Sequence, residues 1–353
     1  MFIPILNDFG LAGTQCTVTP FGSGLINHTW RVTDSEDKTY ILQQLNATVF
    51  PQPFRIAENI SRLSDYLQAQ HPGYIFPGQV HTLQGPALWH DGRKAYYRLM
   101  PFIGPSVAYD VVESPEQAYE AAKQFGRFTR LLSDFPTNDL HITLEGFHDL
   151  GARYVQFENA LQQGNPARIE NATQAIAQIK AQRSLADAYD QIRHDREFRL
   201  RVTHHDTKIS NVLFDPENKG LCVIDLDTVM PGYFISDLGD MLRTYLSPVS
   251  EEEKDLGKIQ VREAYFMAVI KGYVSEMRES LTDTERRHLV YAGQFMTYMQ
   301  ALRFLTDYLH NDRYYGARYE GHNLVRAQNQ LELLRQLTER ETELQEMAAG
   351  IFR

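Results

Sequence analysis

The stretch Val202-Thr-His-His-Asp-Thr-Lys-Ile-Ser-Asn-Val-Leu-Phe214 is the most informative part of the chain. It reads as an apolar strand that leads into a polar loop, followed by a second apolar strand. A third apolar run begins at Cys222 and ends in two carboxylates, Asp225 and Asp227. This pattern predicts a strand-rich segment over residues 200–228, with polar side chains placed where the strands end.

The polar loop reads His-x-Asp-x-Lys-x-x-Asn and ends at Asn211. Phosphoryl transfer needs a carboxylate near the accepting hydroxyl, oxygen ligands for Mg²⁺ and a cation beside the transferring phosphate. The pattern therefore predicts Asp206 as the catalytic carboxylate that contacts the acceptor, and Lys208 as the cation. Asn211 and Asp225 are the predicted metal ligands.

Several neighbouring residues also have ordinary structural explanations. A carboxylate at the end of a strand most often caps a turn, so Asp227 is either a second metal ligand or a cap. His204 is expected to hold the loop by a side-chain hydrogen bond rather than to act as an acid or base. Asp237 and Asp240 are expected to brace the loop.

These residues resemble the catalytic segment of the aminoglycoside-phosphotransferase-like branch of the protein-kinase-like superfamily, which also contains choline-type kinases. The closer resemblance is to the N-acetylhexosamine 1-kinases, whose segment His-Asn-Asp-Thr-Lys-x-x-Asn-Val is similar to residues 204–212. The run Val223-Ile-Asp-Leu-Asp-Thr-Val-Met-Pro-Gly232 resembles the same family, although His205 stands where its members usually have Asn. The similarity extends from Gly22 to about Tyr315 and implies a kinase-like fold that uses ATP and Mg²⁺.

A glycine-containing turn, Phe21-Gly-Ser-Gly-Leu-Ile-Asn27, lies between two predicted strands. Glycines let the backbone approach phosphates closely, although most Gly-x-Gly turns only join a hairpin. With the catalytic segment downstream, Gly22, Ser23 and Gly24 are predicted to cover the phosphates. The resemblance implies that the connector near Met100 and Phe102 offers backbone groups to adenine.

The third predicted strand departs from the usual kinase pattern. Kinases of this superfamily usually carry a basic residue there, paired with a helix Glu, to hold the phosphates. This chain has Gln43 at that position, and Glu58 on the following helix falls on the face opposite the apolar stripe. Gln43 is predicted to contact phosphate by hydrogen bonds, with Lys38 and Lys94 as alternative cations.

The acceptor pocket is expected in the C-terminal half, around Arg303. Arg303 lies in a largely apolar helix that is followed by clustered aromatic and polar residues, a mixture that suits sugars but also describes a helix end with surface tyrosines. The stretch resembles the Arg-Phe-Leu-x-Asp-Tyr segment of the N-acetylhexosamine 1-kinases, which implies that Arg303 and Tyr314 contact the sugar. An aminoglycoside pocket would need many carboxylates, and the run Glu251–Glu253 reads instead as a solvated helix start.

Strands are predicted at residues 16–19, 29–33, 39–45, 87–90 and 94–102, the last two flanking an Asp91-Gly92 hairpin turn. A helix is predicted to begin at Pro53, with apolar residues at helical spacing through Leu67. Residues 114–133, 148–196 and about 251–348 read as further helices. The sequence thus predicts an α+β, bilobal protein-kinase-like fold, with a β-rich nucleotide-binding lobe, 1–101, and a mainly helical catalytic and substrate-binding lobe, 102–353.

Composition narrows the possible partners. The chain has 353 residues with 35 Lys+Arg and 45 Asp+Glu, a net charge of −10, which argues against binding nucleic acid or an anionic membrane. It contains two cysteines, so neither a disulfide framework nor a zinc site is expected. It has no long apolar run, so we expect no membrane span and a cytoplasmic location.

The sequence therefore predicts an ATP- and Mg²⁺-dependent kinase that phosphorylates a sugar, at the anomeric hydroxyl of an N-acetylhexosamine. Another small-molecule hydroxyl, of the aminoglycoside, choline or homoserine type, is the alternative acceptor. A nucleotide-binding regulator without catalysis is a further alternative because of Gln43, although intact Asp206, Asn211 and Asp225 argue against it.

Overall fold

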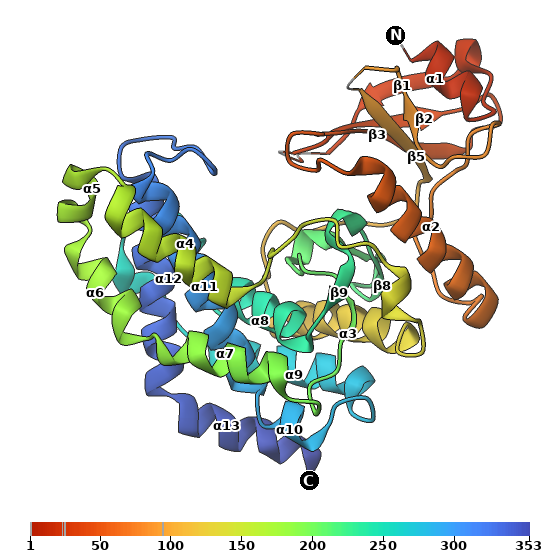
Figure 1. Cartoon of the computed structure of the whole chain (residues 1–353). Coiled ribbons are helices and arrows are strands. Elements are labelled where there is room, and N and C mark those ends of the chain that lie inside the picture. Colours follow the sequence, from red (N-terminus) through yellow and green to blue (C-terminus); the bar gives the residue numbers. More distant parts are fainter. Residues whose placement is uncertain (1, 23, 25, 94) are drawn as a thin grey trace. The chain divides into compact units, whose positions relative to one another are not determined.

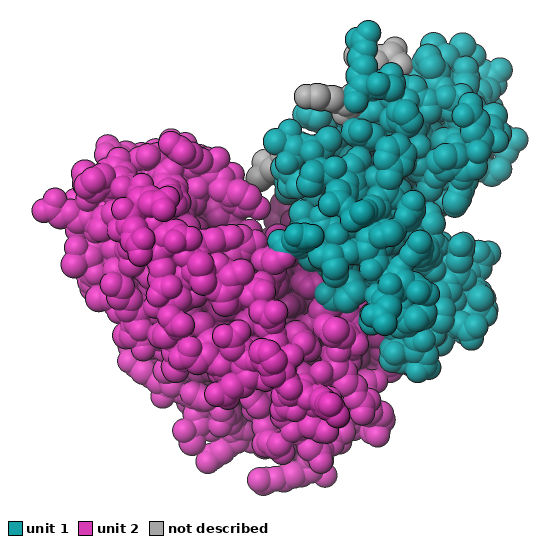
Figure 2. Space-filling view, in the orientation of Figure 1, with its two compact units in different colours: residues 1–108, 131–145, 212–231 teal, residues 109–130, 146–211, 232–353 magenta. Residues whose placement is uncertain are grey.

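The computed structural model describes residues 2–22, 24, 26–93 and 95–353. By its internal contacts the chain forms two compact units, which Figure 2 shows in different colours. Unit 1 comprises residues 1–108, 131–145 and 212–231, and unit 2 comprises residues 109–130, 146–211 and 232–353. This division by contacts does not test the predicted functional lobes, 1–101 and 102–353.

Unit 1 is built on a five-stranded antiparallel sheet in the order β1-β2-β3-β5-β4 (Figure 1). Its strands are β1 (Thr17–Pro20), β2 (His28–Thr33), β3 (Thr39–Leu45), β4 (Trp89–His90) and β5 (Tyr96–Pro101). All five were expected within a few residues. The predicted hairpin turn joins β4 to β5, where the positive φ of 75° at Gly92 is a conformation that glycine adopts without a steric penalty.

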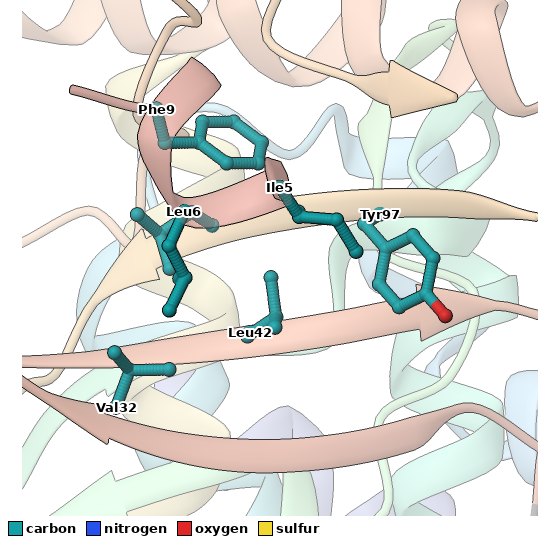
Figure 3. Packing of buried hydrophobic residues seen from close by; sticks show 7 residues of the cluster. Ile5, Leu6, Phe9, Val32, Leu42 and Tyr97 are labelled. Atoms are coloured by element: carbon teal, nitrogen blue, oxygen red, sulfur yellow. The ribbon is translucent and has the colours of Figure 1, made fainter. Parts of the chain in front are cut away.

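A short helix that the sequence did not predict, α1 (Ile3–Asp8), packs on this sheet. Figure 3 shows Ile5, Leu6 and the following Phe9 against Val32 and Leu42 of the central strands, all of them buried. Six residues are too few to show a helical period, so the pattern that reveals longer helices is absent here. The buried apolar surface is what holds α1 in place.

Helix α2 (Pro53–Gln70) begins at the predicted proline and buries its expected apolar stripe. Asn59 is a buried polar side chain of α2. Its amide group donates to the carbonyls of His141, at 2.9 Å, and Val229, at 3.2 Å. Asn59 therefore ties α2 to the two later segments of unit 1. Those segments include β7 (Val212–Phe214), β8 (Gly220–Val223) and the 3₁₀ turn η4 (Leu226–Thr228).

Unit 2 is mainly helical, and its long buried helix α11 (Leu289–Leu309) packs against α8 and α12. The other helices begin with α3 (Pro115–Leu131), α4 (Leu150–Gln163), α5 (Pro166–Asn171), α6 (Thr173–Ala181) and α7 (Ser184–His194). They continue with α8 (Phe234–Tyr245), α9 (Glu263–Met277), α10 (Asp283–Arg286), α12 (His322–Glu339) and α13 (Glu341–Ala349). The short strands are β6 (Arg201–Thr203) and, where the chain passes from unit 1 to unit 2, β9 (Met230–Gly232).

Two helical expectations differ from the structure. Helix α8 was not predicted, because Asp237, Gly239 and Asp240 are weak helix formers. They interrupt the apolar residues whose spacing would otherwise indicate a helix. The run beginning at Glu251 forms a turn rather than a helix start, and the Glu251 carboxylate pairs with Arg243. Within the described residues, no helix combines the length and apolar character needed to cross a bilayer.

Candidate active site

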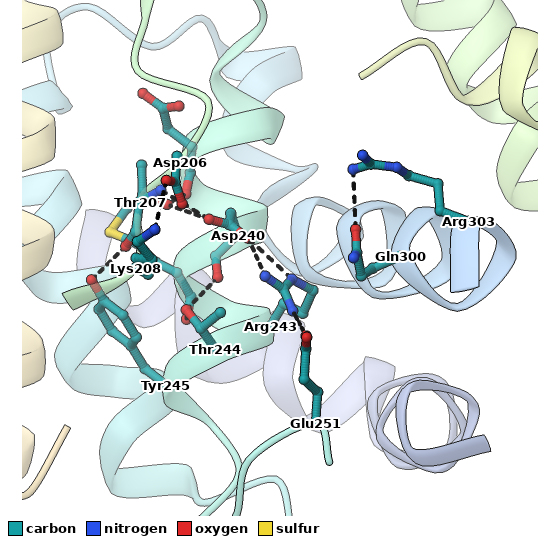
Figure 4. A network of polar contacts seen from close by, with 12 residues as sticks. Asp206, Thr207, Lys208, Asp240, Arg243, Thr244, Tyr245, Glu251, Gln300 and Arg303 are labelled. Carbon is teal, nitrogen blue, oxygen red and sulfur yellow. Dashed lines mark hydrogen bonds and ion pairs between the residues drawn. The ribbon is translucent and has the colours of Figure 1, made fainter. Parts of the chain in front are cut away.

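The loop after β6 brings together, in unit 2, the predicted catalytic residues Asp206 and Lys208 (Figure 4) and the predicted metal ligand Asn211. Oδ2 of Asp206 lies 3.0 Å from Nζ of Lys208 and accepts a hydrogen bond of 3.0 Å from Nδ2 of Asn211. Asn211 is buried and also donates to the Asp206 carbonyl at 2.9 Å. The side chains of Asp206 and Lys208 are 30% and 45% exposed.

Two carboxylates of helix α8 accept hydrogen bonds from the backbone of this loop. The two oxygens of the Asp237 carboxylate accept the amides of His204, at 2.9 Å, and His205, at 2.8 Å. One oxygen of Asp240 accepts the amide of Thr207 at 2.8 Å. Both carboxylates are buried; Asp237 uses both oxygens on the loop, whereas Asp240 uses one there and the other on Arg243.

The two histidines before Asp206 pack inside unit 2. His204 is fully buried against the Phe125 ring, 5.1 Å between centroids, and its Nδ1 accepts the Asp206 amide at 3.4 Å. His205 has a positive φ of 66°, a region that Asn and His enter more readily than most residues. A Cβ on Gly232 would lie 2.5 Å from the His205 ring, so this glycine is required by the close approach.

Asp225 follows β8 in unit 1 and has a left-handed backbone, with φ of 61°. Non-glycine residues in this region are sparse and concentrate at functional sites. The preceding strand pairs Val223 with Val212, the residue directly after Asn211 in the chain. The two predicted metal ligands thus flank one antiparallel strand pair along the sequence.

Asp227 forms a buried ion pair with Arg98 of β5, and each side chain is 1% exposed. Its other oxygen accepts a 2.9 Å hydrogen bond from Nδ2 of Asn27. Both carboxylate oxygens therefore have protein donors within unit 1. These partners fit the structural alternative for Asp227, and its predicted metal ligation stays a prediction.

Arg98 is a buried charged residue beside the predicted site that the sequence interpretation missed. Its Nε and Nη2 donate to Oε1 of Gln43 at 3.0 and 2.7 Å, and Gln43 donates to Thr29 at 3.1 Å. Gln43 and Arg98 are direct partners across β3 and β5. A charged residue inside an apolar strand was the available signal, since buried arginines need partners.

Lys38, one of the two alternative cations of unit 1, already has a carboxylate partner. Lys38 is 64% exposed and pairs with Glu36, and Lys94 lies outside the described residues. Glu58 pairs with His141 at 2.6 Å and does not contact Gln43.

The structure describes Gly22 and Gly24 of the glycine turn that was predicted to cover the nucleotide phosphates. Gly22 has a positive φ of 76° with open space around its Cα, while Ser23 lies outside the described residues. The adjacent Phe21 ring meets the Phe102 ring edge-to-face at 6.0 Å, so the glycine turn and the connector lie close together within unit 1. The Phe102 amide donates to the Thr39 carbonyl at 3.0 Å, and the Arg31 guanidinium lies 4.9 Å from the centroid of the Phe102 ring.

Unit 2 contains a pocket of about 220 Å³ whose lining includes both predicted substrate residues, Arg303 and Tyr314. The Arg303 guanidinium lies 5.3 Å from the centroid of the Phe147 ring. The His205 ring lies 6.3 Å from the same ring, centroid to centroid. Phe147 therefore connects the pocket to the residue next to Asp206.

A family model described as the phosphotransferase enzyme family matches residues 17–268 of the chain. The chain belongs to this family. The match covers the glycine turn, the catalytic loop and Asp225. Membership in the phosphotransferase enzyme family confirms the predicted enzyme class, whereas the finer resemblance to N-acetylhexosamine 1-kinases stays a prediction.

Solved structures of related fold agree with this assignment. The chain is similar to the amicoumacin kinase hAmiN in complex with AMP-PNP, Ca²⁺ and Ami, with 15% identity, TM-score 0.61 and coverage of 90% of this chain and 88% of that one. A microcompartment-associated aminopropanol kinase matches with 16% identity, TM-score 0.58 and 97% coverage of both chains. Choline kinase from Cryptosporidium parvum Iowa II matches with 13% identity, TM-score 0.56 and coverage of 96% and 94%. These similarities confirm the predicted kinase-like α+β fold.

The residues of this phosphotransferase suit a hard divalent cation. Mg²⁺ prefers oxygen ligands, and usually takes one or two from protein carboxylates and amides, with phosphates and water completing the shell. The amide nitrogen of Asn211 donates to Asp206, so its oxygen is the atom left for a cation. Clusters of three or more His, Cys, Asp or Glu side chains able to hold a metal are absent from the described residues.

Asp237 makes the stability of this phosphotransferase dependent on pH. Burial raises the pKa of its carboxyl group to about 7, from an ordinary value of 3.8, although the amides of His204 and His205 act in the opposite direction. The folded protein then binds this proton more tightly than the unfolded chain, so the contribution to stability is present at low pH and is lost as pH rises toward 7. We expect the free energy of unfolding of wild type, relative to Asp237→Asn, to fall by at least about 1.4 kcal/mol between pH 4 and pH 7.

Urea unfolding of the two proteins across this pH range measures that difference. A difference that stays constant or grows with pH would mean that the Asp237 carboxylate is ionised throughout and that its amide partners outweigh its burial.

Proposed function

We propose that this chain transfers the γ-phosphoryl group of ATP to a sugar hydroxyl, at the anomeric position of an N-acetylhexosamine. The observation that carries the proposal is the arrangement of Asp206, Lys208 and Asn211 on one braced loop, in the same compact unit as the pocket that Arg303 lines. The Asp206 carboxylate would accept the proton of the acceptor hydroxyl. As it does so, the hydroxyl oxygen attacks the γ-phosphorus of ATP, and the bond between that phosphorus and the oxygen of the leaving ADP breaks. Lys208 would offset the charge on the transferring group.

The nucleotide would bind through residues of unit 1. Backbone amides at Gly22 and Gly24 suit phosphate oxygens, and the connector at Met100 and Phe102 would contact adenine. Gln43 would orient the guanidinium of Arg98, because the amide oxygen of Gln43 already accepts two hydrogen bonds from it. Asn211 and Asp225 would hold Mg²⁺, which neutralises charge on the phosphates when bound.

Asp225→Asn tests the metal assignment. Asn adopts the left-handed backbone of this position readily, so the substitution removes charge while keeping the local fold. We expect a higher Mg²⁺ concentration for half-maximal turnover, by roughly tenfold or more, together with weaker nucleotide binding. Magnesium titrations of turnover at fixed ATP measure this. An unchanged Mg²⁺ dependence would move the assignment to Asp227.

The acceptor assignment rests on the pocket. Aromatic rings of Phe147, Tyr314 and Tyr315 surround the Arg303 guanidinium at 5.3–5.9 Å, a combination of apolar faces and strong donors that suits a sugar ring. The alternative is another small-molecule hydroxyl, since the structural neighbours are described as kinases of amicoumacin, aminopropanol and choline.

Turnover with a panel of acceptors separates these possibilities. N-acetylglucosamine, N-acetylgalactosamine, glucose, choline and an aminoglycoside are compared by acceptor-dependent ADP release. We expect the N-acetylhexosamines to give the highest kcat/KM, with NMR coupling between phosphorus and the anomeric proton of the product. Phosphorylation of choline or the aminoglycoside in place of the sugars would refute the sugar assignment while keeping the kinase.

A further inference from the structure

The pocket that Arg303 lines carries an unusual excess of positive charge. It lies between α4 and the end of α11 with the loop that follows, and the charged groups of its lining include Arg153, Arg303, Arg313 and Asp307. Besides His310, three guanidinium groups thus face one carboxylate in a volume of about 220 Å³.

The one carboxylate does not neutralise these cations. Asp307 is buried, and its oxygens accept the amides of Tyr314, at 2.8 Å, and Tyr315, at 2.9 Å. It also accepts a hydrogen bond of 3.2 Å from Asn323. Asp307 therefore shapes the loop that closes the pocket, and its hydrogen-bonding capacity is used there.

The guanidinium groups contact neutral oxygens instead. Arg153 donates to the side chain of Gln156 at 3.0 Å and to the Phe147 carbonyl at 3.3 Å, and its buried Nε has no hydrogen-bond partner. Arg303 donates to the side chain of Gln300 at 3.2 Å. Within the described part of the chain, neither forms an ion pair with a carboxylate.

Some partly buried arginines of unit 2 have carboxylate partners, whereas Arg262 donates to three backbone carbonyls. Arg243 pairs with Asp240 and Glu251, both at 2.8 Å (Figure 4), and Arg168 pairs with Asp312. Arg153 and Arg303 differ from Arg243 and Arg168 because they share one pocket and donate to neutral oxygens there. An arginine held without a carboxylate has a fork of donors ready for an external anion.

The titration behaviour of neighbouring groups agrees with this excess charge. Burial, and after it repulsion from Arg303, lower the pKa of Arg153. The pKa of His148 is well below its ordinary value because of burial first, and then because of His205, Arg303 and Arg153. An anion in the pocket would relieve this repulsion.

We propose that the pocket binds an anionic group of the acceptor, a carboxylate or a phosphate, through Arg153, Arg303 and Arg313. The inference rests on the proposed function and sharpens it: the acceptor is an acidic sugar derivative, such as an N-acetylhexosamine bearing a carboxylate or phosphate away from its anomeric carbon. Guanidinium groups bind both anions with paired hydrogen bonds. Cationic acceptors such as choline or an aminoglycoside are disfavoured by the same charges.

The test compares three acceptors that share one ring: N-acetylglucosamine, its 6-carboxylate and its 6-phosphate. We expect kcat/KM of wild type to be at least tenfold higher for one of the acidic sugars than for the neutral one, and this preference to weaken with added salt. A preference for the 6-carboxylate or for the 6-phosphate identifies whether the pocket binds a carboxylate or a phosphate. Arg153→Gln and Arg313→Gln should each reduce the ratio of acidic to neutral kcat/KM several-fold, whereas the exposed Arg335→Gln on α12 should leave it unchanged.

Calorimetric binding of the same sugars to the full chain gives a second readout that does not need turnover. Equal binding of the neutral and acidic sugars, with no loss in Arg153→Gln, would overturn the anion site even if the neutral sugar is phosphorylated, and the proposed kinase would then stand. Efficient phosphorylation of choline with no sugar turned over would overturn both. Tight binding of an acidic sugar that depends on Arg153 would support the site, whichever hydroxyl reacts.

Discussion

Replacing Asp206 with Asn is expected to lower kcat by roughly 10²–10⁴-fold while KM for ATP changes little. Asn keeps the size of the side chain and can still meet Asn211 and Lys208, which lie 3.0 Å from the carboxylate oxygen. It cannot accept the proton of the acceptor hydroxyl, so the loss falls on the transition state. Steady-state kinetics with the best acceptor measure the effect.

A matched substitution shows whether the loss is specific. Asp187→Asn lies on α7 at an exposed carboxylate and is expected to keep wild-type kcat. Thermal unfolding of Asp206→Asn should show a folded protein. If Asp206→Asn turned over at the wild-type rate, another group would have to orient the acceptor, and the catalytic role of Asp206 would be refuted.

Arg98→Met is expected to lower the free energy of unfolding by about 3–5 kcal/mol. The substitution leaves the Asp227 carboxylate buried without its cation, at a position where each partner is 1% exposed. It also removes both hydrogen-bond donors to Oε1 of Gln43. Because η4 begins one residue after Asp225, we expect nucleotide binding to weaken as well.

Urea unfolding measures the loss of stability, and a second substitution tests its cause. Arg98→Met combined with Asp227→Leu should recover part of the stability, because the uncompensated charge is then gone. Arg335→Met removes an exposed arginine and should cost less than about 1 kcal/mol. Equal stability of Arg98→Met and wild type would show that the pair does not hold η4 to the sheet.

The elements with a clear period could be predicted from the sequence. The strands of unit 1 and the stripe of α2 follow alternation and helical spacing, which depend on neighbouring residues alone. Helix α1 and helix α8 were missed for different reasons. The first is too short to display a period, and the second carries Asp237 and Asp240, which serve the loop at the expense of helix propensity.

The candidate site could be predicted where its residues are close in sequence. Asp206, Lys208 and Asn211 share one loop, and local spacing was enough to place them together. The partnership of Arg98, Gln43 and Asp227 joins three distant segments, and it depends on strand register that no local pattern specifies. The charge of the pocket that Arg303 lines could not be predicted either, because Arg153 belongs to a helix far from Arg303 in sequence.

Transfer of labelled γ-phosphoryl from ATP to an N-acetylhexosamine, in a single-turnover reaction with Mg²⁺, tests the central claim most directly. The account predicts that wild type moves the label to the sugar in step with ADP formation, and that Asp206→Asn binds ATP but transfers label at least about 100-fold more slowly. Label that appears only as inorganic phosphate, or that transfers equally fast in Asp206→Asn, would contradict it.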